Sequence, residues 1–407
     1  MSKYQAYPEY KNSGIEWLGE IPSHWKTCRL KHLASIKNGQ DYKVVQSEVG
    51  YPVMGSGGQF AFATEFMYDK PSVLLGRKGT IDKPLYINEP FWTVDTMYYT
   101  EMQPETDAKY LYYLATTIQF ARYSTNTALP SMTQEHLGNY TFAVPVEVSD
   151  RTQIANFLDH ETAKIDALIE KQQQLISLLQ EKRQAVISHA VTKGLNPDVP
   201  MKDSGVEWLG QVPEHWVCGR LKNTLRIKNG KDYKDVEVED GGYPVYGSGG
   251  IFKRCSAYLF DGKSILFGRK GTVDKPLLVE GKFWTVDTMF YSELEASCRA
   301  EFIFFQSLLF PFSLLSTNTA LPSMTQEDLL GLGFVIPPLT EQDSIIEHIT
   351  FKKNQFDGLV FKAERAVRLL KERRTALISA AVTGKIDVRN WQTPGQSPST
   401  STEEQAL

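Results

Sequence analysis

An internal duplication constrains the fold of this chain more than any other feature of its sequence. The segment STNTALPSMTQE runs from Ser124 to Glu135 and recurs without a change from Ser316 to Glu327. These twelve residues mix hydroxyls, an amide, a proline and a methionine, so no single packing rule requires them twice. Comparing the sequence with itself at a fixed offset is therefore the first test to apply.

Further segments recur in the same order along the chain. SGIEWLGEIPSHW at 13–25 returns as SGVEWLGQVPEHW at 204–216, which is 191 residues later. The other pairs are IKNGQDYK (36–43) and IKNGKDYK (227–234), YPVMGSGGQF (51–60) and YPVYGSGGIF (243–252), LLGRKGTIDKPL (74–85) and LFGRKGTVDKPL (266–277), FWTVDTM (91–97 and 283–289), and KRQAVISHAVTKG (182–194) and RRTALISAAVTGK (373–385). One module of about 190 residues is present twice, and two copies form a tandem pair rather than a solenoid.

The first part of each module predicts a globular domain that is α/β or mostly β. It is rich in aromatic residues, glycine-containing turns and short β-prone runs such as SVLLGR and FWTVDTMYYT. Within it, Lys109–Tyr123 and Glu301–Leu315 have the pattern of helices.

The second part of each module predicts one long helix. Residues 150–191 contain neither proline nor glycine, and a 42-residue helix would span roughly 60 Å at about 1.5 Å per residue. Apolar residues recur there with a heptad spacing, and the stretch 341–382 repeats the pattern. The residues expected to pair the helices are Leu158, Ile165, Leu168, Leu175, Leu179 and Val186 in the first copy, and Ile349, Phe356, Leu359, Leu370 and Leu377 in the second.

An apolar stripe must be buried, and the nearest equal stripe belongs to the other copy. We therefore expect an α+β chain in which two similar globular domains are separated by two long helices that form an antiparallel coiled coil with a pseudo-two-fold repeat. The alternative is that each helix lies along its own domain. The expected divisions are a first domain (1–149), a first helix (150–193), a linker (194–203), a second domain (204–340), a second helix (341–385) and a disordered tail (386–407).

Bulk composition narrows the class of protein. No apolar run reaches the ~18 residues of a membrane helix, and the first residues lack the apolar core of a signal peptide. The four cysteines form no CxxC pair, which suits a reduced compartment and a cytoplasmic location. The net charge is −4, so a DNA-binding role requires that positive charge be concentrated locally.

Catalytic motifs are missing from the sequence. There is no Walker loop, HExxH, paired CxxC or GxSxG, and no NPP[FY] or DPP[FY] motif of adenine methylation. Turn or capping roles are expected for the repeated acids Asp95 and Glu135 and for their copies Asp287 and Glu327. Thr133 is expected to cap a helix. We expect no catalytic residue, no metal and no cofactor in this chain.

Basic residues indicate where DNA could be held. Five Lys or Arg face one Asp between Lys26 and Lys43, and six face one between Arg220 and Lys234. An Arg-Lys pair flanked by glycines suits a tight turn that approaches phosphate while Arg reaches a base edge. The candidate DNA-binding residues are Lys37, Arg77, Lys78, Thr80, Lys83, Asn126, Thr127 and Ser131, and in the second copy Lys228, Arg269, Lys270, Thr272, Lys275, Asn318, Thr319 and Ser323. Each segment alone could be a solvated hairpin or loop, but two equal surfaces suit a ligand with two-fold symmetry such as duplex DNA.

Taken in order, these segments resemble the specificity subunit of type I restriction–modification enzymes. The resemblance covers nearly the whole chain twice and lies in KNSGIEWLGEIPSHW, GRKGTIDKP, FWTVDTM, ALPSMTQEHL and IANFLDHETAKIDALI. It implies two target-recognition domains that each read half of a bipartite DNA sequence, and helices that set the spacing and dock two modification subunits. It also implies that S-adenosylmethionine, ATP and magnesium act on the partner modification and restriction subunits.

One departure from the family pattern is informative. The two recognition domains of a typical member differ greatly, whereas roughly half of the aligned positions match here. We therefore expect two closely related half-sites in inverted orientation, which make a near-palindrome with a non-specific gap. The domains diverge mainly at 59–70 against 251–262 and at 101–123 against 293–315. The alternatives are a tandem scaffold that binds no DNA and a specificity subunit of a type IIB-like modification system.

Overall fold

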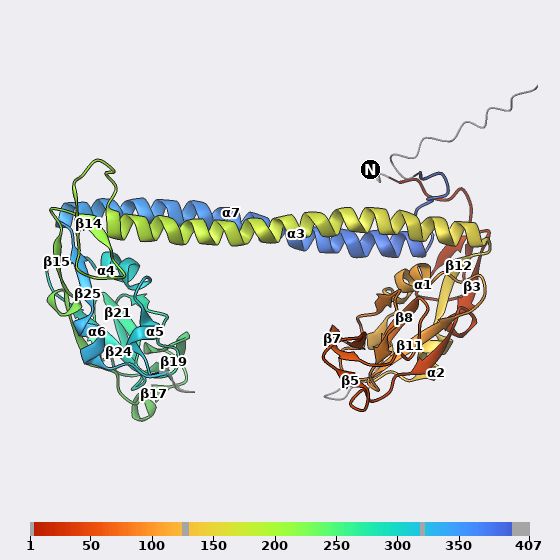
Figure 1. The fold of residues 1–407 in the computed structure, drawn as a ribbon, viewed down its shortest axis with the longest axis horizontal. Helices are drawn as coiled ribbons and strands as arrows, with labels where there is room; N and C mark the ends of the chain where they lie inside the picture. The colour runs from red at the N-terminus through yellow and green to blue at the C-terminus, as the bar shows by residue number, and fades with distance from the viewer. Residues whose placement is uncertain (1–3, 124–129, 318–321, 393–407) are drawn as a thin grey trace, which may run out of the picture. The chain divides into compact units, whose positions relative to one another are not determined.

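A computed structural model of the chain describes residues 4–123, 130–317 and 322–392. It divides into two compact units, one made of Met1–Gln172 with Arg365–Leu407 and the other of Gln173–Glu364. Each unit contains one globular domain and part of each of the two long helices, α3 (Val148–Lys193) and α7 (Leu339–Val382) (Figure 1).

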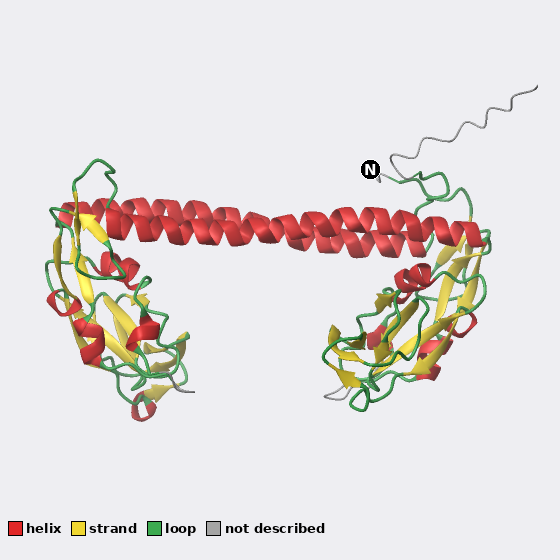
Figure 2. Cartoon of the chain, in the orientation of Figure 1, coloured by secondary structure: helices red, strands yellow, loops and turns green. Residues whose placement is uncertain are grey.

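The first globular domain is built from short strands and a few short helices (Figure 2). Its two main sheets have the strand orders β4-β11-β8-β9 and β10-β6-β7-β5. The strands are β1 (Tyr10–Asn12), β2 (Glu20–Pro22), β3 (Trp25–Arg29), β4 (Ala34–Asn38), β5 (Gln46–Ser47), β6 (Tyr51–Gly55), β7 (Gly58–Ala63), β8 (Ser72–Gly76), β9 (Leu85–Ile87), β10 (Trp92–Thr93), β11 (Met97–Met102) and β12 (Thr141–Pro145). The helices are η1 (Leu30–His32), α1 (Ala108–Ala115), η2 (Phe120–Arg122) and α2 (Gln134–Asn139).

The second globular domain repeats this topology, with sheets β16-β24-β21-β22 and β17-β19-β18-β23-β20. Its strands are β13 (Met201–Asp203), β14 (Gln211–Pro213), β15 (Val217–Arg220), β16 (Leu225–Asn229), β17 (Glu237–Val238), β18 (Tyr243–Gly247), β19 (Gly250–Cys255), β20 (Phe260–Asp261), β21 (Ser264–Gly268), β22 (Leu277–Val279), β23 (Lys282–Thr285), β24 (Met289–Leu294) and β25 (Gly333–Ile336). Its helices are η3 (Leu221–Asn223), η4 (Lys234–Val236), α4 (Ala300–Ser307), α5 (Phe312–Leu315) and α6 (Gln326–Gly331). The internal repeat in the sequence is thus a repeat of structure.

A fully buried central strand anchors each domain. All five residues of β8 and all five of β21 are buried, as their apolar runs require. The one polar side chain in each strand is satisfied, because Ser72 donates to the Thr100 carbonyl at 2.8 Å and Ser264 donates to the Ser292 carbonyl at 2.7 Å.

The helices inside the domains are shorter than the sequence pattern predicts. Over 109–123 the structure has α1, capped by Asp107, and then the 3-10 turn η2. The hydroxyls of Thr116 and Thr117 donate back to backbone carbonyls at the end of α1, a local bonding that competes with helix continuation. Over 301–315 the structure has α4 and α5, and Pro311 lies between them.

The long helices pair antiparallel within each unit, as the sequence pattern predicts. In the first unit Arg374 of α7 donates to Asp166 of α3 at 2.9 Å, and in the second unit Arg183 of α3 donates to Asp357 of α7 at 2.5 Å. Each acid is the repeat counterpart of the other, 191 residues apart, and so is each arginine. The same ion pair therefore forms twice with the two helices exchanged.

The seam between the helices takes different residues from those that the heptad count predicts. Leu168 and Leu359 are each 48% exposed and Leu175 is 42% exposed, so these three predictions are wrong. The apolar seam of a paired helix can step by either three or four residues along the sequence. The half-buried residues are instead those that directly follow these leucines, Ile169, Ile176 and Val360. The other predicted pairing residues are buried or half-buried.

The ends of the helices pack into the globular domains. Leu158 of α3 belongs to the core of the first domain together with Ile378 of α7, and Ile349 of α7 belongs to the core of the second domain with Ile187 of α3. Both expected arrangements of the apolar stripe therefore occur. Near its start each helix packs against its own globular domain, and farther along it pairs with the other helix.

The first residues of the segment expected to be a disordered tail, 386–392, are packed against the first unit. Ile386 and Val388 are buried, and the ring of Trp391 lies 5.6 Å from that of Phe157. Tyr4 packs on the same phenylalanine at 5.2 Å. The prediction of disorder is wrong for 386–392 because these residues cover an apolar surface of α3; the rest of the tail lies outside the described residues.

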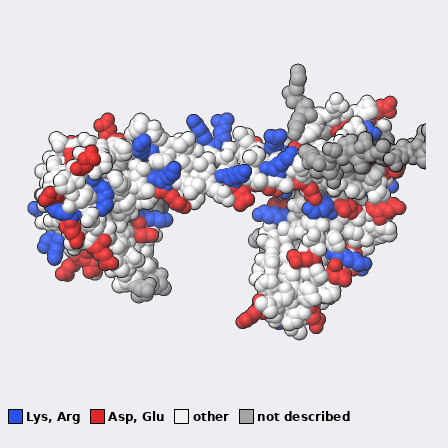
Figure 3. Space-filling view, turned by 45° about the horizontal axis from the view of Figure 1, so that its top comes forward, with Lys and Arg blue, Asp and Glu red and all other residues white. Residues whose placement is uncertain are grey.

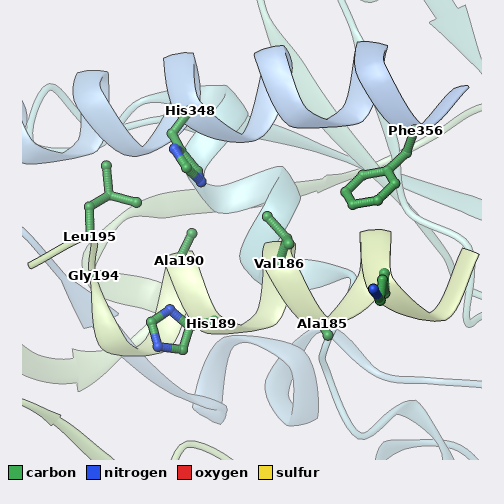
Figure 4. A pocket seen from close by; sticks show the side chains of 9 residues that line it. Ala185, Val186, His189, Ala190, Gly194, Leu195, His348 and Phe356 are labelled. Carbon is green, nitrogen blue, oxygen red and sulfur yellow. The ribbon is translucent and has the colours of Figure 1, made fainter. Parts of the chain in front are cut away.

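The matching place in the second unit is an open groove of about 520 Å³ between α3 and α7 (Figure 4). Its lining is mostly apolar, with Val186, Leu195 and Phe356 beside two histidines, His189 and His348. His348 takes the place of Phe157 in the repeat. The offset of 191 residues puts Pro200 of the linker in the place of Trp391, and the linker at 194–200 contains no aromatic residue.

The burial of neighbouring leucines on α3 makes a stability prediction. Leu179 is 8% exposed and Leu178 is 56% exposed. Leu179→Ala should lower the free energy of unfolding by about 2 kcal/mol or more, because it removes buried methyl groups and leaves a cavity. Leu178→Ala is the matched control and should change it little. Denaturant unfolding of both variants checks this, and equal losses would contradict the seam described above.

Candidate nucleic-acid interface

Four of the repeated segments converge around one short stretch of a fifth in each domain. In the first domain this hub is Thr93–Thr96, the TVDT of FWTVDTM. The segments IKNGQ, VMGSGG, GRKG and LPSM bond to it directly or through one another. Backbone groups make most of these bonds, so the network fixes the course of the loops and leaves most of their side chains free to vary.

One side of the hub holds the end of β4 and the end of β6. The Gln40 amide donates to the Thr93 carbonyl at 2.9 Å, and the preceding Gly39 amide donates to the Met97 carbonyl at 3.0 Å. The Val94 amide donates to the Met54 carbonyl at 3.2 Å, next to the GSGG turn of the hairpin β6–β7.

The other side of the hub holds the glycine-flanked basic turn. The amides of Arg77 and Lys78 both donate to the Thr96 carbonyl, at 2.9 and 3.2 Å. The same basic turn is bonded to the LPSM loop. The Gly79 amide donates to the Pro130 carbonyl and the Met132 amide donates to the Arg77 carbonyl, each at 2.9 Å. Lys78 and Ser131 thus form an isolated β-bridge.

The second domain repeats this network around Thr285–Thr288. The Lys231 amide donates to the Thr285 carbonyl at 2.9 Å, and the Arg269 amide donates to the Thr288 carbonyl at 2.8 Å. Lys270 and Ser323 form the same isolated bridge between the basic turn and the second LPSM loop. The predicted basic turn and the repeated loop are brought together twice.

Glycine is required where backbone strands approach most closely. A Cβ on Gly39 would lie 2.1 Å from the Val94 carbonyl oxygen, and one on Gly230 would lie 2.0 Å from that of Val286. A Cβ on Gly76 would lie 2.5 Å from the Thr80 carbonyl oxygen. These distances are too short for any larger residue, so the glycines of IKNG and GRKG hold the framework together.

The two arginines of the basic turns are half-buried. The guanidinium of Arg77 donates to the Asp95 carbonyl at 3.2 Å and lies 5.9 Å from the centre of the Tyr98 ring. The guanidinium of Arg269 donates to the Asp287 carbonyl at 3.3 Å. One bond each leaves most of the five guanidinium N–H donors available.

The remaining basic and hydroxyl candidates differ in how free they are. Lys78, Thr80, Lys83 and their counterparts Lys270, Thr272 and Lys275 are exposed. Lys37 is 3.5 Å from Glu101 and Lys228 is 3.7 Å from Glu293, so each already has a carboxylate partner across its sheet. Asn126, Thr127, Asn318 and Thr319 lie outside the described residues.

Helix capping at the end of each repeated loop follows the prediction. The hydroxyl of Thr133 accepts a hydrogen bond from the His136 amide, and Thr325 accepts one from the Asp328 amide, both at 3.1 Å. The neighbouring Gln134 side chain donates to the Ile36 carbonyl at 3.2 Å and ties the loop to β4.

Sequence reasoning missed an exposed aromatic residue on each hairpin. Phe60 is 54% exposed and Phe252 is 50% exposed, beside the GSGG turns. Their rings stand edge-on to those of Tyr42 and Tyr233, at 5.2 and 5.4 Å. The signal was available, because both residues occupy the same place in the repeated YPVMGSGGQF and YPVYGSGGIF segments.

Charges of both signs are mixed on the globular domains, and Lys and Arg side chains are spaced along the long helices on the face drawn in Figure 3. Among the described residues no group of three or more His, Cys, Asp and Glu side chains could hold a metal ion. No helix in the described part of the chain is both long and apolar enough to span a membrane.

The close approach at Gly39 makes a prediction about the framework. Gly39→Ala should lower the free energy of unfolding by about 3 kcal/mol, the upper part of the ordinary range, because its methyl group would overlap the Val94 carbonyl. It should also increase hydrogen exchange of the amides at 93–97. Gly57→Ala is the control, since a Cβ there meets nothing within 4 Å. Equal behaviour of the two variants would contradict the network.

Comparison with known proteins places this framework in a family. The sequence model of the "type I restriction modification DNA specificity domain" matches residues 22–178 and 213–354. The chain is 20% identical over 413 residues to the type I restriction enzyme EcoDI specificity subunit of Escherichia coli, covering 92% of this chain and 91% of the relative. It is 22% identical over 423 residues to the MjaVIII specificity subunit of Methanocaldococcus jannaschii, covering 91% and 95%.

Two solved structures share the fold. A chain from work on complex assembly and conformational transition of the type I R-M system has a TM-score of 0.66 at 16% identity and matches 90% of this chain and 99% of its own length. The HsdS subunit from Thermoanaerobacter tengcongensis has a TM-score of 0.51 at 13% identity, over 90% of this chain and 98% of that one. With the family model matching both halves, this chain belongs to the type I restriction–modification DNA specificity family.

Proposed function

We propose that this chain is the DNA-reading subunit of a type I restriction–modification complex, in which each globular domain reads one half of a bipartite double-stranded target. The observation that carries the proposal is the convergence of the basic turn, the LPSM loop and the GSGG hairpin around the hub, once in each domain. The chain contributes recognition and no catalysis, as do the specificity subunits to which it is related.

The exposed lysines and the half-buried arginines suit two different kinds of contact with DNA. Lys78, Lys83 and their counterparts are flexible cations that fit phosphate contacts, which position a protein without reading sequence. Arg77 and Arg269 are each held by one guanidinium hydrogen bond, and the remaining donors of the planar group suit paired contacts with a guanine edge in the major groove. Because the two frameworks match so closely, the half-sites are closely related and inverted, as a near-palindrome with a gap.

The long helices are proposed to dock two modification subunits. Leu168 and Leu359 are repeat counterparts and are both 48% exposed; Leu178 and Leu369 are also counterparts, 56% and 53% exposed. Each unit thus carries one exposed leucine from each helix. Two copies of one apolar surface suit two copies of one partner.

The chemistry is assigned to the partners in this proposal. S-adenosylmethionine belongs on the modification subunits, and ATP and magnesium belong with the restriction subunits.

Long-read methylation sequencing tests the function. A strain that expresses this chain with its modification subunits should carry one bipartite methylated motif with two related, inverted halves. Removing this chain should abolish that motif. A motif with unrelated halves would contradict the near-palindrome alone, and the absence of any motif that depends on this chain would contradict the proposed function.

Arginine variants test the reading role. Arg77→Ala should relax one half-site and Arg269→Ala the other, each at a cost of about 1–3 kcal/mol in discrimination, because a paired base contact is lost. Lys78→Ala is the control and should weaken binding to all sequences alike and reduce the salt dependence. Competition binding of the assembled complex to target and mismatched duplexes measures this. Unchanged discrimination in both arginine variants would remove them from the reading role.

Leucine variants test the docking surface. In the first unit, Leu168→Asp combined with Leu369→Asp should leave a complex that retains one modification subunit instead of two, because charge replaces the apolar contact. Native mass spectrometry of the reconstituted complex counts the subunits. Lys171→Asp combined with Lys371→Asp is the control, since both lysines are exposed on the same helices. Two bound subunits in the leucine variant would place the docking surface elsewhere.

A further inference from the structure

One position differs within an otherwise identical repeated segment. IKNGQDYK at 36–43 and IKNGKDYK at 227–234 match at every residue except Gln40 and Lys231. Gln40 lies just after β4 and Lys231 just after β16, and the backbone of each bonds directly to the hub. The two domains thus carry different side chains, an amide and an amine, at one position of the same backbone arrangement.

The backbone of this position is fixed in the same way in both domains. The Gln40 amide donates to the Thr93 carbonyl and the Lys231 amide to the Thr285 carbonyl, both at 2.9 Å. The Gln40 carbonyl accepts from the Trp92 indole at 3.1 Å, and the Lys231 carbonyl accepts from the Trp284 indole at 2.9 Å. Since both polar backbone groups are engaged, the two side chains leave the framework from equivalent points.

Both side chains are exposed and unengaged. Neither Gln40 nor Lys231 has a side-chain hydrogen bond or ion pair to any described residue, whereas the neighbouring Lys37 and Lys228 each pair with a glutamate. The structure therefore gives this position no internal role that would require glutamine in one copy and lysine in the other.

The two side chains prefer different base edges. A glutamine amide has both a donor and an acceptor and matches N6 and N7 of adenine, whereas a lysine ammonium has donors alone and matches O6 and N7 of guanine. We propose that Gln40 and Lys231 each contact the equivalent base pair of their half-sites, with adenine preferred in the first and guanine in the second. The proposal rests on the proposed function and makes the near-palindrome imperfect at a defined place.

Exchange of the two residues tests the proposal. The probe is a pool of duplexes randomised at both half-sites, and the protein is the full chain assembled with its modification subunits. Gln40→Lys should change the preferred base from adenine to guanine at one position of the first half-site, by about five-fold or more, so that the two halves then agree there. Lys231→Gln should produce the reverse change in the second half-site.

Controls separate this proposal from its rivals. Lys362→Gln makes the same substitution on the exposed surface of α7, outside the loop network and the basic stretches, and should leave both preferences unchanged. Uniform weakening by Lys231→Gln with no change of preferred base would mean that Lys231 holds phosphate, and unchanged selection by both exchange variants would mean that the position makes no contact. Either result overturns the proposal while the wild-type complex still selects a target. A wild-type complex that selects no target would instead overturn the proposed function.

Discussion

The burial of two equal apolar stripes against each other is the constraint on which the rest of this structure depends. Each long helix comes from the same repeated module, so the two helices present similar apolar stripes and carry an Asp and an Arg at equivalent positions. An antiparallel pair lets the Asp of one copy meet the Arg of the other, and the exchange of roles gives the ion pairs Asp166–Arg374 and Asp357–Arg183. Hydrogen bonds from Lys353 and Arg183 hold the pKa of Asp357 below its usual range, so this carboxylate stays ionised near neutral pH.

The helix pair also decides what each compact unit contains. The start of each helix packs into the core of the domain that precedes it in the chain, and the end of the other helix packs into the same core. A unit is therefore made from segments far apart in the sequence, and the ion pairs join these segments again beyond the cores. This arrangement makes two domains of one chain depend on the same two helices.

The candidate interface is held together mainly by backbone hydrogen bonds and not by apolar packing. Short loops that carry exposed polar side chains have little apolar surface to fix them, so each hub holds them through amide and carbonyl groups. Glycines at 39, 76 and 230 permit backbone contacts that no other residue could make. The side chains that project from this frame can then vary without disturbing it, as Gln40 and Lys231 do. Recognition specificity and loop stability are separated in this way.

Much of this molecule was determined by the sequence alone. Two copies of one module, a long proline-free helix in each, the threonine caps and the glycine-flanked basic turns all follow from local patterns, because repeats and periodicity are written in the order of residues. The tertiary structure alone decided which leucines are buried, since steps of three and of four along a helix are both compatible with a seam until the partner helix is in place. It alone showed that Lys37 is paired with Glu101 and that Trp391 covers Phe157, because these contacts join residues far apart in the chain. Only the tertiary structure showed that the repeated loops converge on one hub in each domain. Backbone hydrogen bonds hold them there, and the identity of the side chains does not reveal which backbone groups are bonded.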